Sequence, residues 1–243
     1  MIEVKGECWL VTAAHIIHDL EKRVKQKCLE QFIACDAWSG SDGTGRPVVL
    51  LREPSRWLSV GDGENLDLGA IELGPLLTEN LKVGKVLAVP ETEWRHPPAT
   101  FDFHVLLGTP GDLIEASPPT GLPKSLAPKR ALASVKRIAQ PAYDDVKGHE
   151  RFYGKFVRNK MPEGIEVKNI GGMSGGPIFG CKRTAKGLRT WVIAVQSGWY
   201  PDKKVIYADF LPPLITLIEK RMRERKIPRI VKRRKKASSL RHH

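Results

Sequence analysis

The sequence predicts an all-β protein, and three observations support this prediction. The 243 residues include 22 glycines and 18 prolines, spread among short apolar runs, as expected for many strands joined by turns. The length suits a single β domain with a sizeable core. No internal repeat or compositionally simple segment precedes the C-terminus. The apolar runs that we expect to form strands include residues 46–51, 85–89, 103–107, 189–196 and 204–208.

The other expected elements follow along the chain. Residues 9–14 form an apolar run, expected to be a strand ending at His15, and a short helix is expected after His15, through Asp19 to Glu30. Residues 65–73 alternate apolar residues with others and place Asp67 at the mouth of a half-buried strand. A helix near the end of the chain begins at two prolines. Its apolar face is expected to contain Leu214, Leu217, Ile218 and Met222.

A glycine-rich turn at residues 171–177, with the sequence Gly-Gly-Met-Ser-Gly-Gly-Pro, is the most informative stretch. The glycines around Ser174 permit positive φ angles and leave room for a substrate carbonyl. The N–H groups of Gly172 and Ser174 would point at the oxygen that becomes negative during acyl transfer, which is worth about 3–4 kcal/mol per donor. A serine nucleophile also needs a base, and the base needs an orienting partner.

Three motifs together resemble the trypsin-like (chymotrypsin-fold) serine peptidases, of the bacterial type without disulfides. They are Thr-Ala-Ala-His ending at His15, D-L-x-A-x-x-L starting at Asp67, and G-x-S-G-G-P around Ser174. The resemblance implies that His15 takes the proton from Ser174 and returns it to the leaving amine, while Asp67 holds the imidazole in the accepting tautomer. His18 is interpreted as a surface residue of a helical turn, and Asp62 as a turn residue.

The same resemblance implies two six-stranded antiparallel β-barrels with catalysis in the cleft between them. The peptidase domain would span 1–225, with a first barrel at about 1–108, a linker at about 109–127, and the second barrel and C-terminal helix at about 128–225. Only eleven residues precede the Thr-Ala-Ala-His segment, so the first barrel is short of its N-terminal strand. Either the true start of the chain lies upstream, or another element closes the sheet edge.

The resemblance also suggests where a substrate binds. Lys168 would lie near the base of the specificity pocket and attract acidic side chains, the alternative being a solvated lysine. Gln196, Ser197 and Gly198 resemble the strand that pairs with the substrate backbone, and Gly198 would leave the pocket entrance open. Met173 stands where digestive relatives carry an aspartate that pairs with a newly cut N-terminus, so that activation switch is absent.

The cysteines and the apolar content bear on cofactors and location. Four cysteines allow two disulfides, but Ile16 stands where disulfide-rich secreted relatives carry a cysteine, so free thiols are expected at Cys8, Cys28, Cys35 and Cys181. No Cys/His cluster has zinc spacing, and neither a metal nor an organic cofactor is expected. Without a long apolar segment or a signal peptide, a cytoplasmic location is expected.

Positive charge is concentrated at the C-terminus. The chain has a net charge of +13, and 12 of its 40 lysines and arginines lie in residues 220–243 against one acidic residue, Glu224. Residues 226–243 are therefore expected to be a basic tail that is disordered by itself. Such a tail can bind nucleic acid, an anionic membrane or an acidic partner protein, or it can act only as a solubilising segment.

Two classes of function follow. In the first, the protein is a serine endopeptidase that cleaves peptide bonds through an acyl-enzyme at Ser174. In the second, the fold is a catalytically weak binding or scaffold module, and the basic tail contacts nucleic acid or an acidic partner. The complete set of His15, Asp67 and Ser174 favours the first class. An esterase that uses the same acyl chemistry differs only in its leaving group.

Overall fold

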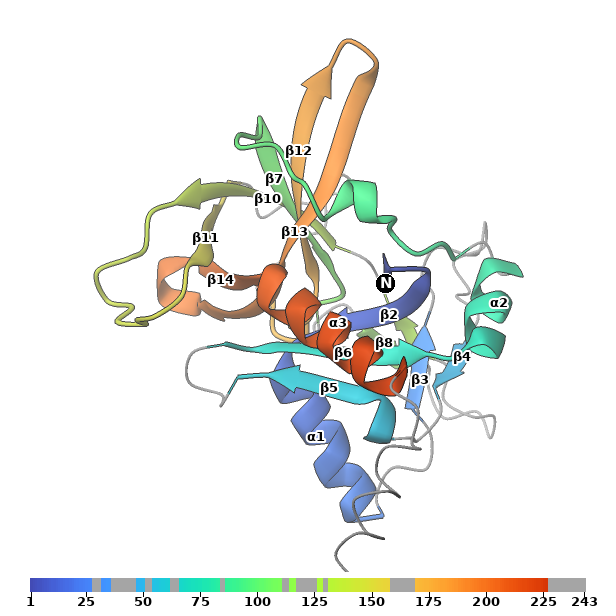
Figure 1. The fold of residues 1–243 in the computed structure, drawn as a ribbon. Helices are drawn as coiled ribbons and strands as arrows, with labels where there is room; N and C mark the ends of the chain where they lie inside the picture. Colours follow the sequence, from blue (N-terminus) through green and yellow to red (C-terminus); the bar gives the residue numbers. More distant parts are fainter. Residues whose placement is uncertain are drawn as a thin grey trace, which may run out of the picture.

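A computed structural model gives the fold of the chain (Figure 1). Three residues that the sequence singled out, Asp62, Lys168 and Cys28, lie outside the residues that it describes, as does the basic tail beyond residue 226. The described residues are 1–27, 32–35, 47–50, 54–61, 66–83, 86–110, 114–116, 126–128, 131–157 and 169–226.

The N-terminal half contributes an open four-stranded antiparallel sheet with the strand order β1-β2-β6-β5. A two-residue turn joins its first two strands, and Lys5 and Gly6 both have positive φ there (49° and 82°), as such tight hairpins require. A separate two-stranded sheet pairs β3 with β4. The strands are β1 (Ile2–Val4), β2 (Glu7–Thr12), β3 (Phe32–Cys35), β4 (Pro47–Leu50), β5 (Trp57–Val60) and β6 (Leu68–Leu73).

The C-terminal half is a closed antiparallel barrel of six strands in the order β10-β11-β14-β13-β12-β7. Its interior is filled by apolar side chains such as Leu106, Phe152 and Ile178, none of which is exposed. The predicted fold class is confirmed, because the protein is mostly β and combines this barrel with a second sheet and a C-terminal helix. The barrel strands are β7 (Phe103–Gly108), β10 (Ala131–Ile138), β11 (Arg151–Phe156), β12 (Pro177–Thr184), β13 (Gly187–Tyr200) and β14 (Val205–Phe210).

The boundary between the two halves differs from the prediction. We expected Phe103 to Leu107 to end the first barrel, but β7 pairs with β10 and β12 and so belongs to the closed barrel. The expected extended linker contains a small hairpin in which β8 (Ile114–Ala116) pairs with β9 (Leu126–Pro128). Residues 86–89, expected to lie in a strand, form only a single bridge between Val89 and Ile2 at the edge of the first sheet.

Helices cover both faces of the first sheet (Figure 1). Because side chains alternate along a strand, Cys8 and Ile71 face α1 and α2, whereas Trp9 and Leu68 face the barrel and α3. This packing buries the open sheet without closing it into a barrel. The helical segments are α1 (Ala14–Lys25), α2 (Pro75–Val83), α3 (Pro212–Lys226), η1 (Pro54–Arg56), η2 (Glu91–Glu93) and η4 (Pro201–Lys203).

Two helices can be compared with their predictions. The C-terminal helix starts at Pro212 as expected, and its buried face includes Leu214, Ile218 and Met222, with Ile215 in place of the half-buried Leu217. The first helix begins at Ala14 rather than after His15, because its buried face starts at Ala14 itself.

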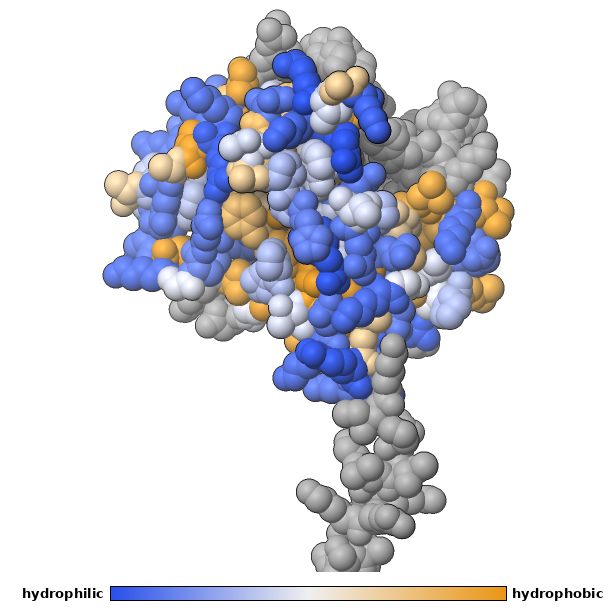
Figure 2. Space-filling model, turned by 45° about the horizontal axis from the view of Figure 1, so that its top comes forward, coloured by the Kyte–Doolittle hydropathy of each residue, from blue (hydrophilic) through white to orange (hydrophobic). Residues whose placement is uncertain are grey.

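The surface is mostly hydrophilic in the view of Figure 2, with hydrophobic side chains gathered at the edge that carries α2. Leu76 and Val83 on this helix and Leu87 just after it are more than 70% exposed. In the part of the chain that is described, no helix has the length and apolar character needed to cross a bilayer.

Candidate active site

The ends of two neighbouring strands bring His15 and Asp67 together. Strand β2 ends at Thr12, which pairs with Gly69 near the start of β6. Asp67 directly precedes β6, as predicted. We expected His15 to end the strand, but it is the second residue of α1, which begins just after β2. The backbone therefore turns sharply at Ala13 and Ala14, both almost completely buried.

The Asp67 carboxylate holds His15 at two points. One oxygen accepts the backbone N–H of His15 at 2.8 Å, and the other accepts the ring Nδ1–H at 2.6 Å. The first bond has a structural reason, since the first N–H groups of a helix lack partners and Ala13 offers no side chain to cap them. Because a carboxylate only accepts, the neutral ring carries its proton on Nδ1, and Nε2 is left as the acceptor.

The same contacts set the protonation behaviour of the imidazole. The side-chain hydrogen bond to Asp67 raises the pKa of His15 above its ordinary value, and the charges of Asp67 and Asp19 add to the effect while partial burial opposes it. The His15 side chain is 48% exposed and that of Asp67 only 16%. The ring thus reaches solvent while its orienting carboxylate is largely covered.

The glycine-rich turn is tightly constrained by its own backbone. Met173 is buried in the barrel core, and its N–H and carbonyl bond Ile170 and Gly176 at 3.0 and 2.8 Å. Gly172 and Gly175 have φ angles of 90° and 87°, a region that favours glycine. Ser174 is left half-buried at the tip of the turn. Among the described residues, neither the N–H of Gly172 nor that of Ser174 donates a hydrogen bond.

The turn lies against the strand end that leads to His15. A Cβ placed on Gly175 would collide with the hydroxyl of Thr12 and would lie 3.3 Å from the backbone nitrogen of Ala13. Only glycine permits this approach between the barrel and the first sheet. Gly175, which follows Ser174, and Ala13, two residues before His15, therefore lie side by side across the boundary of the two halves. Within the described residues, no hydrogen bond joins Ser174 to His15.

The predicted substrate strand differs from expectation. The N–H and carbonyl of Gln196 bond Gly176 and Gly175, each at 2.8 Å, so they support the turn and are not free for a substrate. Gly198 was expected to leave a pocket entrance open, but a Cβ there would overlap the phenol of Tyr207, which occupies that space. Ser197 is buried and turns its hydroxyl inward.

One buried acid at this boundary was missed in the sequence. Asp209 lies on β14 with no exposed surface, and it accepts hydrogen bonds from the backbone N–H of Asp67 at 2.9 Å and from the Ser197 hydroxyl at 2.7 Å. A signal was present, since Asp209 is the single charged residue in the run Val-Ile-Tyr-Ala-Asp-Phe. A carboxylate in such a strand is rarely buried without a partner.

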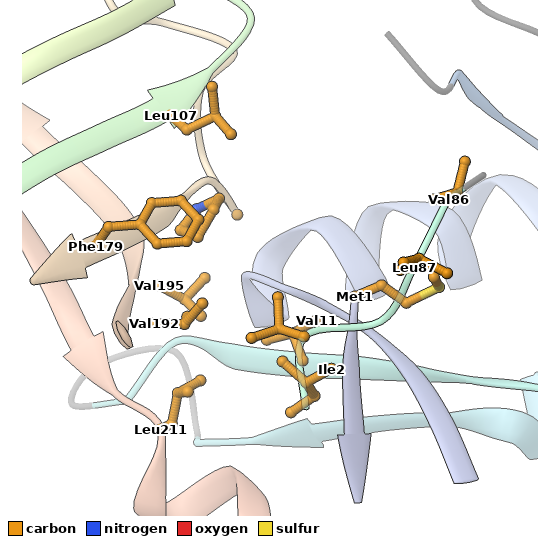
Figure 3. A pocket seen from close by; sticks show the side chains of 13 residues that line it. Met1, Ile2, Val11, Val86, Leu87, Leu107, Phe179, Val192, Val195 and Leu211 are labelled. Carbon is orange, nitrogen blue, oxygen red and sulfur yellow. The ribbon is translucent and has the colours of Figure 1, made fainter. Parts of the chain in front are cut away.

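An apolar cavity of about 410 Å³ lies behind the turn, between the first sheet and the barrel (Figure 3). Figure 3 shows Val11 and Ile2 on one side of it, and Phe179 and Leu107 on the other. Gly175 is part of its wall, and each of the described side chains that line it is apolar. Within the described part of the chain, the cavity therefore offers no acid, base or hydrogen-bonding side chain to the site.

The described part of the chain contains no group of three His, Cys, Asp or Glu side chains that could hold a metal ion. Cys8 and Cys181 are both buried free thiols, and burial raises the pKa of the Cys181 thiol. The side chains of Cys28 and Cys35 lie outside the described residues.

Comparisons with known proteins find a likeness among solved structures alone. No family model and no curated protein matches the sequence. Among solved structures, the apo form of the MamO protease domain from Magnetospirillum magneticum is similar at 11% identity. The match covers 86% of this chain and 81% of that chain, with a TM-score of 0.41. A likeness at this level carries no argument about activity, and the fold class rests on the strand pairing itself.

Proposed function

We infer that the protein is a serine endopeptidase that works through an acyl-enzyme at Ser174. The observation that carries this proposal is the double contact between Asp67 and His15, which fixes the ring and leaves Nε2 as a base. The close approach of Gly175 to Thr12 and Ala13 supports it further, because the turn with Ser174 then faces the same strand end.

In the proposed reaction, Ser174 Oγ forms a bond to the acyl carbon of the substrate as its proton passes to His15 Nε2. Asp67 stabilises the imidazolium that results. When the tetrahedral intermediate collapses, the carbon–nitrogen bond breaks and the proton on His15 goes to the leaving amine. A water molecule then repeats the sequence and releases the acyl group, which restores the Ser174 hydroxyl.

The N–H groups of Gly172 and Ser174 are the proposed donors to the oxyanion. Gly172→Ala tests this role, because alanine resists the φ of 90° at this position and the amide plane would turn. We expect acylation to slow by about 10²- to 10³-fold, the usual cost of one lost donor. Gly171→Ala is the matched control, since Gly171 has no positive φ and meets only the side chain of Asn169.

Labelling with a fluorophosphonate probe tests the nucleophile. The native chain should be labelled, whereas Ser174→Ala and His15→Ala should not. His18→Ala and Ser134→Ala are matched controls, because His18 contacts Ser59 rather than Asp67 and Ser134 is exposed on β10. Labelling that persists in Ser174→Ala would contradict the proposal, and a native chain that takes no label would favour the binding or scaffold function.

Substrate preference forms a second layer of the proposal. Peptides that differ only in the residue before the cleaved bond would show whether acidic side chains are preferred, as Lys168 suggests, and fast cleavage after arginine would contradict that preference. Hydrolysis of esters without any cleavage of peptides would identify an esterase.

The basic tail is proposed to bind nucleic acid or an acidic partner, and a chain that ends at Arg225 should lose that binding.

A further inference from the structure

Asp209 is a carboxylate without any exposed surface at the boundary between the barrel and the first sheet. Its Oδ2 accepts the backbone N–H of Asp67 and the hydroxyl of Ser197, and its Oδ1 lies 3.0 Å from Arg151 Nε and 3.2 Å from His149 Nε2. Burying a carboxylate costs several kcal/mol unless its oxygens are satisfied, and here both are.

These hydrogen bonds connect the closed barrel to the first sheet, and each requires a defined geometry. Arg151 lies on β11 and Ser197 on β13, so they fix Asp209 within the closed barrel. Asp67 belongs to the first sheet, directly before β6. The apolar core between the two halves can tolerate small shifts, whereas a hydrogen bond of 2.9 Å to the Asp67 N–H weakens steeply when its geometry changes.

We propose that Asp209 is a positioning residue that holds the backbone of Asp67 against the barrel and thereby orients the carboxylate that supports His15. It touches neither the reacting atoms nor a substrate, and it acts through Asp67. Its catalytic consequence rests on the proposed acyl transfer at Ser174, but its effect on the His15 ring does not.

A purely structural role is the competing explanation, because removing one partner from a buried ion pair strongly destabilises a protein. The two explanations differ in what happens to molecules that still fold. A structural role lowers the folded fraction and leaves the contact between His15 and Asp67 intact. A positioning role weakens that contact in the folded molecule.

Asp209→Asn is the informative variant. Its amide has one accepting oxygen in place of two. The charged guanidinium of Arg151 attracts that oxygen more strongly than neutral donors do, so the NH₂ group should face the Asp67 N–H and the Ser197 hydroxyl, and both lose their acceptor. Arg225→Gln is the matched control. It breaks the ion pairs that tie α3 to the first sheet at Glu72 and Glu7, and the Arg225 side chain forms no hydrogen bond or ion pair with Asp67 among the described residues.

The first measurement is an NMR titration of the His15 ring in the full chain. Asp209→Asn should lower the pKa of His15 toward its ordinary value, Ser197→Ala should lower it less, and Arg225→Gln should leave it unchanged. This readout does not require activity. An unchanged pKa in folded Asp209→Asn would overturn the proposal. If Asp209→Asn does not fold, Ser197→Ala and His149→Ala carry the test, since each removes one donor from the same carboxylate.

The second measurement is the rate of fluorophosphonate labelling per folded molecule across pH. Asp209→Asn should slow it by about 10- to 100-fold, as expected when a reacting group is slightly misplaced. The acid limb of its pH profile should also move to lower pH. Ser174-dependent labelling at the native rate in Asp209→Asn would overturn the positioning role and leave the proposed function standing. No labelling of the native chain would refute the proposed function, while the NMR titration would still decide the role of Asp209.

Discussion

Replacing Asp67 by asparagine tests the site at its most constrained point. Asp67 accepts two donors from His15, the backbone N–H and the ring Nδ1–H, at 2.8 and 2.6 Å. An asparagine has only one accepting oxygen, so its NH₂ group must face one of these two donors. The helix holds the backbone N–H in place, and the ring must therefore give up its Nδ1 proton and carry it on Nε2.

That change of tautomer sets the expected magnitude. With a proton on Nε2, the ring cannot accept the Ser174 proton, and the acylation rate should fall by about 10⁴-fold. At 1.36 kcal/mol for each factor of ten, this is roughly 5.5 kcal/mol of lost transition-state stabilisation. The structure should otherwise survive, because asparagine is close in shape to aspartate.

The assay is the pH dependence of fluorophosphonate labelling in the native chain and in Asp67→Asn. Because the hydrogen bond to Asp67 raises the pKa of His15, the native acid limb should lie above the ordinary imidazole value of about 6.5. In Asp67→Asn the limb should move to lower pH and the plateau should fall. A loss smaller than about tenfold, or an acid limb that does not move, would refute this reasoning.

Three further predictions concern stability and reactivity. Gly175→Ala should lower the free energy of unfolding in urea by more than about 1 kcal/mol and by more than Gly6→Ala, because both have positive φ but only Gly175 is also crowded, by Thr12. His15→Gln should destabilise the protein more at about pH 5.5 than at about pH 9. The pKa of His15 is higher in the folded chain than in the unfolded one, so the protonated ring stabilises the fold below the unfolded-state pKa, and this stabilisation is lost as pH rises through the folded-state pKa. Thermal melts at the two pH values measure the difference, which should stay under about 1 kcal/mol because the ring is half exposed. Cys181 should react with iodoacetamide only after unfolding, since the thiol is buried and its pKa is raised. Mass spectrometry measures the adduct, and modification of Cys181 in the folded protein would contradict this prediction.

The sequence predicted local features better than it predicted partners across the fold. The alternating pattern around Asp67 located β6, and the prolines at 212 and 213 located α3, because such signals depend on neighbouring residues. The placement of β7 could not be predicted in this way. It is settled by pairing with β10 and β12, which lie far along the chain, and an apolar run carries no information on which sheet receives it.

The candidate site shows the same division. Ser174 and its glycines form a turn whose positive φ angles follow from residue type, so the sequence was sufficient there. Gln196 was assigned to a substrate because nothing local shows that its backbone is already bonded to the turn. Asp209 was missed for the same reason, since its four partners come from three separate segments, around residues 67, 149–151 and 197.

The boundary between the two halves is therefore where the proposed function and the stability of the fold depend on the same few atoms. Apolar contacts such as those of Trp9 and Leu214 hold the halves together, but they are not directional and fix no register. The register comes from the close approach at Gly175 and from the bond between Asp209 and the Asp67 N–H. Since His15 and Asp67 belong to one half and Ser174 to the other, these two contacts should set how well the proposed base meets the proposed nucleophile. A substitution that loosens either contact should slow fluorophosphonate labelling by a larger factor than its effect on the free energy of unfolding suggests. The reason is that acyl transfer depends on displacements of the reacting groups that are too small to unfold the protein.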